Sequence, residues 1–206
     1  GSQPIPRPES WRPGAPAPWT QAAPTPISLA AIVGAVSARP VAPLLPPFSD
    51  ARNSAVLVVL RDGGDGGGGG GGGPEVLLTR RSMELRIHRG EVCFPGGRLV
   101  PGESAVDAAL REAWEEVGLD PAVVTVHGER DHLSTAVSRS YIVPGVASVD
   151  DRPALQPQSG EVDRILWVSL GELARADTFR EELWGTPPMD RPIFFFELDD
   201  ETIWGA

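Results

Sequence analysis

The pattern of apolar positions predicts a series of short strands around one amphipathic helix. Residues 53–60 (NSAVLVVL) and 75–81 (EVLLTRR) are short runs rich in Val and Leu, as expected of strands buried in a sheet. A strand-rich order with a single well-marked helix in the middle favours an α+β fold or a layered α/β/α sandwich. The remaining predicted elements are strands near residues 123–127, 141–149, 162–168 and 193–198, and a short helix at 170–175.

The central helix is predicted over residues 105–117, because both of its ends carry ordinary stop signals. Ser104 precedes it as an N-cap, with Asp107 three residues on as in a capping box. Gly118 follows as a C-terminal stop. One face of the helix forms an apolar stripe at helical spacing, made of Val106, Leu110, Ala113 and Val117.

A second face of this helix concentrates negative charge. Glu112, Glu115 and Glu116 stand at i, i+3 and i+4, so three carboxylates share one side and repel one another. Arg111 is the only adjacent cation in the sequence. Spacing alone favours a solvated acidic face, but a bound Mg²⁺ or Mn²⁺ would relieve the repulsion, because these hard ions prefer oxygen ligands.

The flanks of this pattern define the expected domain organisation. Residues 1–50 are predicted to be a Pro-rich arm, since 12 of the 22 prolines fall within residues 1–47, and most of this arm should be extended and loosely held. Residues 27–38 (ISLAAIVGAVSA) interrupt it as a short helix that Ser28 could cap. Residues 51–206 form the expected main domain, in which residues 62–74 are a Gly-rich flexible loop without phosphate-loop spacing.

Composition removes several classes of function. The formal net charge of −10 argues against a nucleic-acid-binding surface, and no apolar run is long enough to span a bilayer. The single cysteine, Cys93, excludes an internal disulfide and, with no secretory signal evident, favours the cytoplasm. We interpret Gly1-Ser2 as a cloning remnant. The sequence leaves the oligomeric state open, a homodimer included.

The residues around the acidic helix favour a functional role for its glutamates over a solvated surface. Gly97 is followed after five residues by Glu103 and after seven more by Arg111-Glu112, and then by Glu115-Glu116 and Gly118-Leu119. This order resembles the Nudix box, GX5EX7REUXEEXGU, with Ala113 the one departure from a larger aliphatic residue. The chain is therefore similar to Nudix hydrolases.

The resemblance implies a fold, a cofactor and roles for the box residues. It implies an α/β/α sandwich with a mixed sheet, in which the box is a loop–helix–loop. It also implies that Glu112, Glu115 and Glu116 bind Mg²⁺ or Mn²⁺, and that Arg111 orients a carboxylate while Glu103 braces the loop. The backbone of Gly96 or Gly97 would approach the metal. The implied reaction is attack of water on a diphosphate in a nucleotide substrate.

The segment before the box points to one substrate. It contains Leu77-Leu78-Thr79 and Arg81-Ser82, then Arg86, Gly90 and Val92, and ends in Phe94-Pro95-Gly96-Gly97. This is similar to LLTXRSX3RX3GXVXFPGG, the signature of coenzyme A diphosphatases. The resemblance implies coenzyme A as substrate, with Arg81 and Arg86 offering forked donors to its phosphates. It extends weakly to residue 205 and implies a closing helix after it.

Other assignments stay open at this point. ADP-ribose, a dinucleotide or a nucleoside triphosphate could replace coenzyme A, and a non-catalytic nucleotide-binding module would keep the same fold. Glu161 is a candidate for the metal site or the general base, with a surface position as the alternative. Cys93 is interpreted as a small buried residue, and the histidines lack the spacing of a zinc site.

Overall fold

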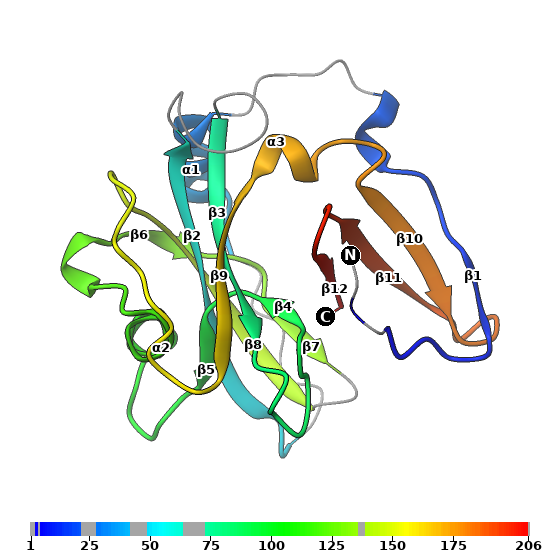
Figure 1. The fold of residues 1–206 in the computed structure, drawn as a ribbon, viewed down its shortest axis with the longest axis horizontal. Helices are drawn as coiled ribbons and strands as arrows, with labels where there is room; N and C mark the ends of the chain where they lie inside the picture. Colours follow the sequence, from blue (N-terminus) through cyan, green and yellow to red (C-terminus); the bar gives the residue numbers. More distant parts are fainter. Residues whose placement is uncertain are drawn as a thin grey trace.

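Two β-sheets lie side by side in the computed structural model, which describes residues 3, 5–21, 28–41, 49–63, 73–135 and 139–205 (Figure 1). The centre of the predicted Gly-rich loop and parts of the Pro-rich arm lie outside these residues. No helix in the described part of the chain is long and apolar enough to cross a membrane.

The larger sheet is mixed and contains eight of the described strands, with the path β4-β3-β2-β8-β6. β2 runs parallel to β8, whereas β2 and β3 are antiparallel neighbours. Three strands attach off this path, since β5 pairs with β2, β7 with β8 and β9 with β3. The strands are β2 (Arg52–Gly63), β3 (Gly73–Arg81), β4 (Val92–Cys93), β5 (Gly96–Arg98), β6 (Thr125–Glu129), β7 (Leu133–Thr135), β8 (Ser140–Ser148) and β9 (Val162–Ser169).

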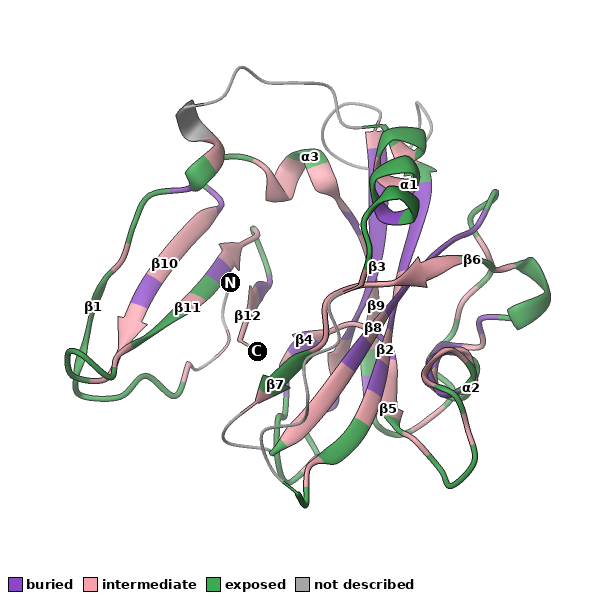
Figure 2. Ribbon diagram, turned by 180° about the vertical axis from the view of Figure 1, so that it is seen from behind, coloured by how far each residue is buried: buried purple, intermediate pink, exposed green. Residues whose placement is uncertain are grey.

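Helices cover both faces of the larger sheet, as the alternation of side chains along β2 requires (Figure 2). On one face, Leu57 and Val59 pack in a core with α2 (Ala105–Val117). On the other, Leu60 packs in a core with α1 (Leu29–Ala38), and α3 (Leu170–Leu173) lies on this side too. This is the expected α+β architecture with a mixed sheet and few helices.

The predicted α2 has the expected ends, but its buried stripe is shifted. Ser104 accepts a hydrogen bond from the Asp107 backbone N–H at 3.1 Å, and Gly118 ends the helix at φ 72°. Val106 is only partly buried, whereas Ala108 and Ala109 are fully buried with Ala113. Small side chains at these positions let the helix lie close to the sheet.

Of the second sheet, only β11 was predicted, as the strand near residues 193–198. This sheet is antiparallel, with the order β1-β10-β11-β12, and its last three strands follow α3 in the chain. β1 belongs to the Pro-rich arm, so this part of the arm is extended but paired, rather than loosely held. The strands are β1 (Trp11–Pro13), β10 (Phe179–Trp184), β11 (Arg191–Glu197) and β12 (Thr202–Trp204), and the 3-10 turns are η1 (Pro18–Gln21) and η2 (Pro121–Val123).

Candidate active site

Glu116 is the most enclosed carboxylate of the box. It is 7% exposed, and its carboxylate accepts a hydrogen bond from the Gly96 backbone N–H at 3.2 Å. Burial raises the pKa of Glu116 to about 7; the Gly96 hydrogen bond opposes this shift, and the nearby charge of Glu112 adds to it. A buried carboxylate beside a second carboxylate is an arrangement that a cation would stabilise.

Both glycines of β5 have neighbours so close that a side chain at either position would clash with them. A Cβ on Gly97 would lie 2.4 Å from the Glu112 carboxyl carbon, so the missing side chain leaves room for this carboxylate. A Cβ on Gly96 would lie 2.3 Å from the Ala55 carbonyl oxygen on β2. Glu112 and Glu116 on α2 therefore both reach the glycine pair on β5.

Arg111 connects the loop before α2 to the acidic face of the helix. Its Nε and Nη2 donate to the two carboxylate oxygens of Glu103 at 2.8 and 3.1 Å. Its Nη1 donates to Glu112 at 2.9 Å and to Glu115 at 3.1 Å. Nη2 also donates to the Arg98 carbonyl at 3.1 Å, so this one guanidinium fixes both ends of the loop.

Glu103 is held on both of its oxygens. Besides the pair with Arg111, it accepts a hydrogen bond from the Val100 backbone N–H at 3.0 Å. The guanidinium of Arg111 and this N–H lower the pKa of Glu103 below its ordinary value. Glu103 therefore joins Arg111 to the loop backbone, and its bracing role stays a prediction.

The three helix glutamates do not all meet. The side chain of Glu115 is 54% exposed and shares Arg111 Nη1 with Glu112, whereas the Glu116 carboxylate accepts from the Gly96 N–H instead. Within the described residues, no three His, Cys, Asp or Glu side chains stand close enough to hold a metal ion. The carboxylates of Glu112 and Glu116 beside the glycine backbone suit Mg²⁺ or Mn²⁺ chemically, and the metal role of all three stays a prediction.

Arg81 and Glu161 complete the surroundings of Glu116. Arg81 Nη2 lies 3.3 Å from a Glu161 carboxylate oxygen, and Arg81 Nε is buried without a hydrogen-bond partner in the described structure. The charge of Arg81 lowers the pKa of Glu116 and that of Glu161 raises it, which places all three groups in one electrostatic environment. Glu161 thus contacts Arg81, and its role at the site stays a prediction, whereas Arg86 is exposed in the loop after β3 and joins no described contact there.

Cys93 and the three histidines contact residues other than the glutamates of the box. Burial raises the pKa of the Cys93 thiol, which contacts Thr79 Oγ1 at 3.6 Å. His88 pairs with Glu91, His127 with Ser148, and His132 with Tyr141. These contacts agree with structural roles.

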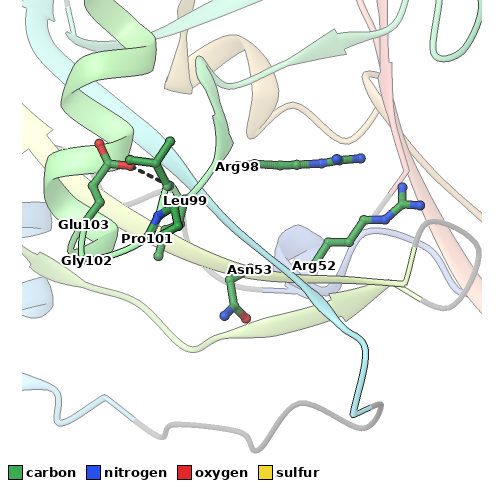
Figure 3. A pocket seen from close by; sticks show the side chains of 8 residues that line it. Arg52, Asn53, Arg98, Leu99, Pro101, Gly102 and Glu103 are labelled. Atoms are coloured by element: carbon green, nitrogen blue, oxygen red, sulfur yellow. Dashed lines mark hydrogen bonds between the residues drawn. The ribbon is translucent and has the colours of Figure 1, made fainter.

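A pocket of about 420 Å³ adjoins the loop between β5 and α2 (Figure 3). Its lining includes Arg52 and Asn53, at the start of β2, and Arg98, which directly follows the glycine pair. The sequence analysis did not single out these three residues. In the sequence, the one indication of this pocket was that Arg98 directly follows Gly97. Arg52 is brought near Arg98 by strand pairing alone. The full lining is Arg52, Asn53, Arg98, Leu99, Val100, Pro101, Gly102 and Glu103.

Comparison with protein families identifies the fold to which this site belongs. The family model described as "NUDIX domain" matches residues 51–186, about two thirds of the chain. The chain therefore belongs to the Nudix family, whose hydrolases generally use divalent ions such as Mg²⁺ or Mn²⁺. The glycine pair, Glu103, Arg111 and the helix glutamates all fall within the matched segment.

Several known proteins are similar to this chain. "Nudix hydrolase 3" of Caenorhabditis elegans is 41% identical over 106 residues, which are 48% of this chain and only 43% of the worm protein. An "Uncharacterized Nudix hydrolase NudL" of Photorhabdus laumondii is 34% identical over 134 residues, covering 64% of this chain and 71% of the relative. A solved MutT/nudix family protein from Enterococcus faecalis matches with a TM-score of 0.49 at 18% identity, covering 85% of this chain and 63% of its own.

Proposed function

We propose that this chain is a metal-dependent diphosphatase whose preferred substrate is coenzyme A or one of its derivatives. Water attacks one phosphorus of the diphosphate, the bridging P–O bond breaks, and the bridging oxygen leaves with the other phosphate. The products are a phosphopantetheine and adenosine 3′,5′-bisphosphate. The water proton is released to a base or to solvent, so atoms and charge balance.

One observation carries this proposal. Two separate sequence motifs, residues 77–97 and 97–119, meet at Glu116. The charge of Arg81 in the first motif acts on Glu116 of the second, and the Gly96 N–H, near the end of the first motif, donates to that same carboxylate. A motif that resembles a coenzyme A signature therefore supplies a cation where the box would act on a diphosphate.

The proposed roles follow from the contacts. Glu112 and Glu116 would hold the divalent ion, with Glu115 as the third candidate ligand. Bound there, the ion supplies polarisation of the phosphoryl oxygens and activation of water. Arg111 and Glu103 keep the loop rigid, which preserves the geometry of the glycine backbone. Glu161, which contacts Arg81 and whose charge acts on Glu116, is the proposed further ligand or general base.

Arg81 and Arg86 are the proposed phosphate contacts. The buried, unpartnered Nε of Arg81 leaves a donor available beside Glu161. Arg86 is exposed and lies in the loop that connects β3 to β4, from which it can turn toward a bound substrate. Forked guanidinium donors suit phosphate oxygens, and each well-formed contact is worth about 1.5–3 kcal/mol.

A product screen tests the proposal. The chain is incubated with Mg²⁺ or Mn²⁺ and with coenzyme A, ADP-ribose, a dinucleoside polyphosphate or a nucleoside triphosphate, and the products are separated by chromatography and weighed by mass spectrometry. We expect the highest kcat/KM on coenzyme A, with the two products named above. We expect Arg81→Ala to lower this value about 10-fold or more, and Arg152→Ala, an exposed control far from the site, to leave it unchanged.

Two outcomes would contradict the proposal in different ways. A higher kcat/KM on ADP-ribose, a dinucleotide or a triphosphate would keep the diphosphatase chemistry and overturn the substrate. Binding of these nucleotides without any new phosphate species, at saturating Mn²⁺, would instead identify a non-catalytic binding module.

A further inference from the structure

The pocket beside the β5–α2 loop carries two arginines with no assigned role. Arg52 and Arg98 lie on adjacent strands, and Ser54 is the register partner of Arg98. Paired residues of antiparallel strands share a face, and so do residues two apart on one strand, so both arginine side chains emerge on the same face. Figure 3 shows the two side chains extending in the same direction.

Neither guanidinium is satisfied within the protein. Among the described residues, the side chains of Arg52 and Arg98 have no hydrogen bond or ion pair, although most arginines of this chain do. The one carboxylate in the lining, Glu103, is already paired on both oxygens with Arg111 and the Val100 N–H. The pocket therefore has a local excess of positive charge in a chain whose formal net charge is −10.

A bound anion would relieve this arrangement. Two like charges on neighbouring strands repel each other, and an anion between them removes the repulsion. Two guanidinium groups present forked donors that match the oxygens of a phosphate group. We propose that Arg52 and Arg98 form a phosphate subsite that takes a phosphate of the substrate other than the cleaved diphosphate.

The position of the subsite relative to the Nudix box supports this role. The inference rests on the proposed function. Arg98 is the residue after Gly97, and consecutive strand side chains point to opposite faces. Gly97 faces Glu112 on α2, so Arg98 faces away from the metal-binding side. A phosphate held by Arg98 is thus near the catalytic loop but separate from the bond that breaks. Coenzyme A offers such a group in its 3′-phosphate.

Binding measurements that need no turnover test the subsite. The wild-type chain and the variants Arg52→Ala and Arg98→Ala are titrated calorimetrically with adenosine 3′,5′-bisphosphate, AMP and inorganic phosphate. Arg152→Ala is the matched control, because Arg152 is exposed. Arg52 pairs with Ser140 at the start of β8, whereas Arg152 follows the other end of β8. The eight-residue span of β2 between these two ends is about 26 Å, well beyond the screening length at physiological salt.

We expect each pocket variant to raise the Kd of the bisphosphate about 10-fold or more and that of AMP much less, with the control unchanged. Arg98→Lys should recover part of the loss. An equal loss for the bisphosphate, AMP and inorganic phosphate would support a phosphate site of the pocket that also accepts free phosphate. Wild-type affinity of both variants for all three probes, or no binding of any probe by the wild-type chain, would overturn the proposal. Since no step requires hydrolysis, a failed product screen would not be mistaken for this result.

Discussion

At the scale of single residues, Gly96 and Gly97 meet neighbours of different kinds, which predicts different effects of adding a methyl group. In Gly97→Ala the new Cβ meets the end of the Glu112 side chain, which can move. We expect this variant to lose about 10-fold or more in kcat/KM while its free energy of unfolding changes by less than about 1 kcal/mol. In Gly96→Ala the Cβ meets the backbone of β2, and we expect a loss of about 1–3 kcal/mol of stability. Steady-state kinetics and urea unfolding measure both effects, and equal stability losses would contradict the assignment.

The enclosed position of Glu116 makes it the most sensitive of the helix glutamates. Glu116→Gln keeps the shape of the side chain and removes its charge, so we expect kcat to fall about 100-fold or more at saturating Mg²⁺. Glu115→Gln should cost less, because Glu115 is exposed and paired with Arg111. Glu172→Gln on α3 serves as the control. Near-full activity of Glu116→Gln would remove this residue from the metal site.

The sequence predicted these side chains but not their contacts. Fixed spacing placed Glu103, Arg111 and the helix glutamates in one motif, because the motif is continuous along the chain. It could not show that Arg111 also donates to the Arg98 carbonyl, since this depends on the path of the loop, whereas the contact with Glu115 follows from i,i+4 spacing on the helix. The spacing of residues along the sequence could not reveal Arg52 as a pocket residue, because strand pairing alone brings it near Arg98.

At the scale of elements, the caps of α2 position the acidic face. Ser104 accepts from the Asp107 N–H and donates its hydroxyl to the Asp107 carboxylate at 2.7 Å. We expect Ser104→Ala to lower the free energy of unfolding by about 1 kcal/mol. Because Glu112 and Glu116 lie in the later turns, we expect kcat to change less than about 2-fold under conditions that keep the chain folded. Urea unfolding followed by circular dichroism measures the first effect, and an unchanged midpoint would contradict the cap.

The long strands of the larger sheet were predictable, whereas only β11 of the second sheet was, for a physical reason. Strands β2, β3, β8 and β9 bury Val and Leu, so their apolar runs are visible locally. β10 (FREELW) contains Glu182, which is 1% exposed and pairs with Arg7 and Arg180. Local patterns place charged residues on the surface, whereas this carboxylate is buried with a cation 175 positions away in the chain. The pairing of β1 depends on the same long-range contacts.

At the scale of the whole molecule, Glu201 joins the two sheets. Glu201 precedes β12 in the second sheet and is 1% exposed. Its carboxylate accepts hydrogen bonds from Arg80 on β3 at 2.8 Å and from Arg164 on β9 at 2.9 Å. One buried carboxylate thus holds two cations of the larger sheet. β3, which carries the start of the 77–97 segment, is therefore fixed to Glu201 near the second sheet.

Removing this carboxylate should loosen the second sheet from the first. Glu201→Ala leaves Arg80 and Arg164 without their shared partner, and both arginines are partly exposed, so water offsets part of the loss. We expect a decrease of about 2 kcal/mol in the free energy of unfolding, below the value for a fully buried pair. Asp199→Ala, an exposed neighbour, is the control. Hydrogen exchange followed by mass spectrometry should show faster exchange in β10, β11 and β12 than in β2 and β8, because the second sheet loses both contacts of Glu201 and keeps the exposed Arg164–Asp200 pair. Exchange that accelerates equally in both sheets, or in neither, would mean that the apolar contacts between the sheets hold them together without Glu201.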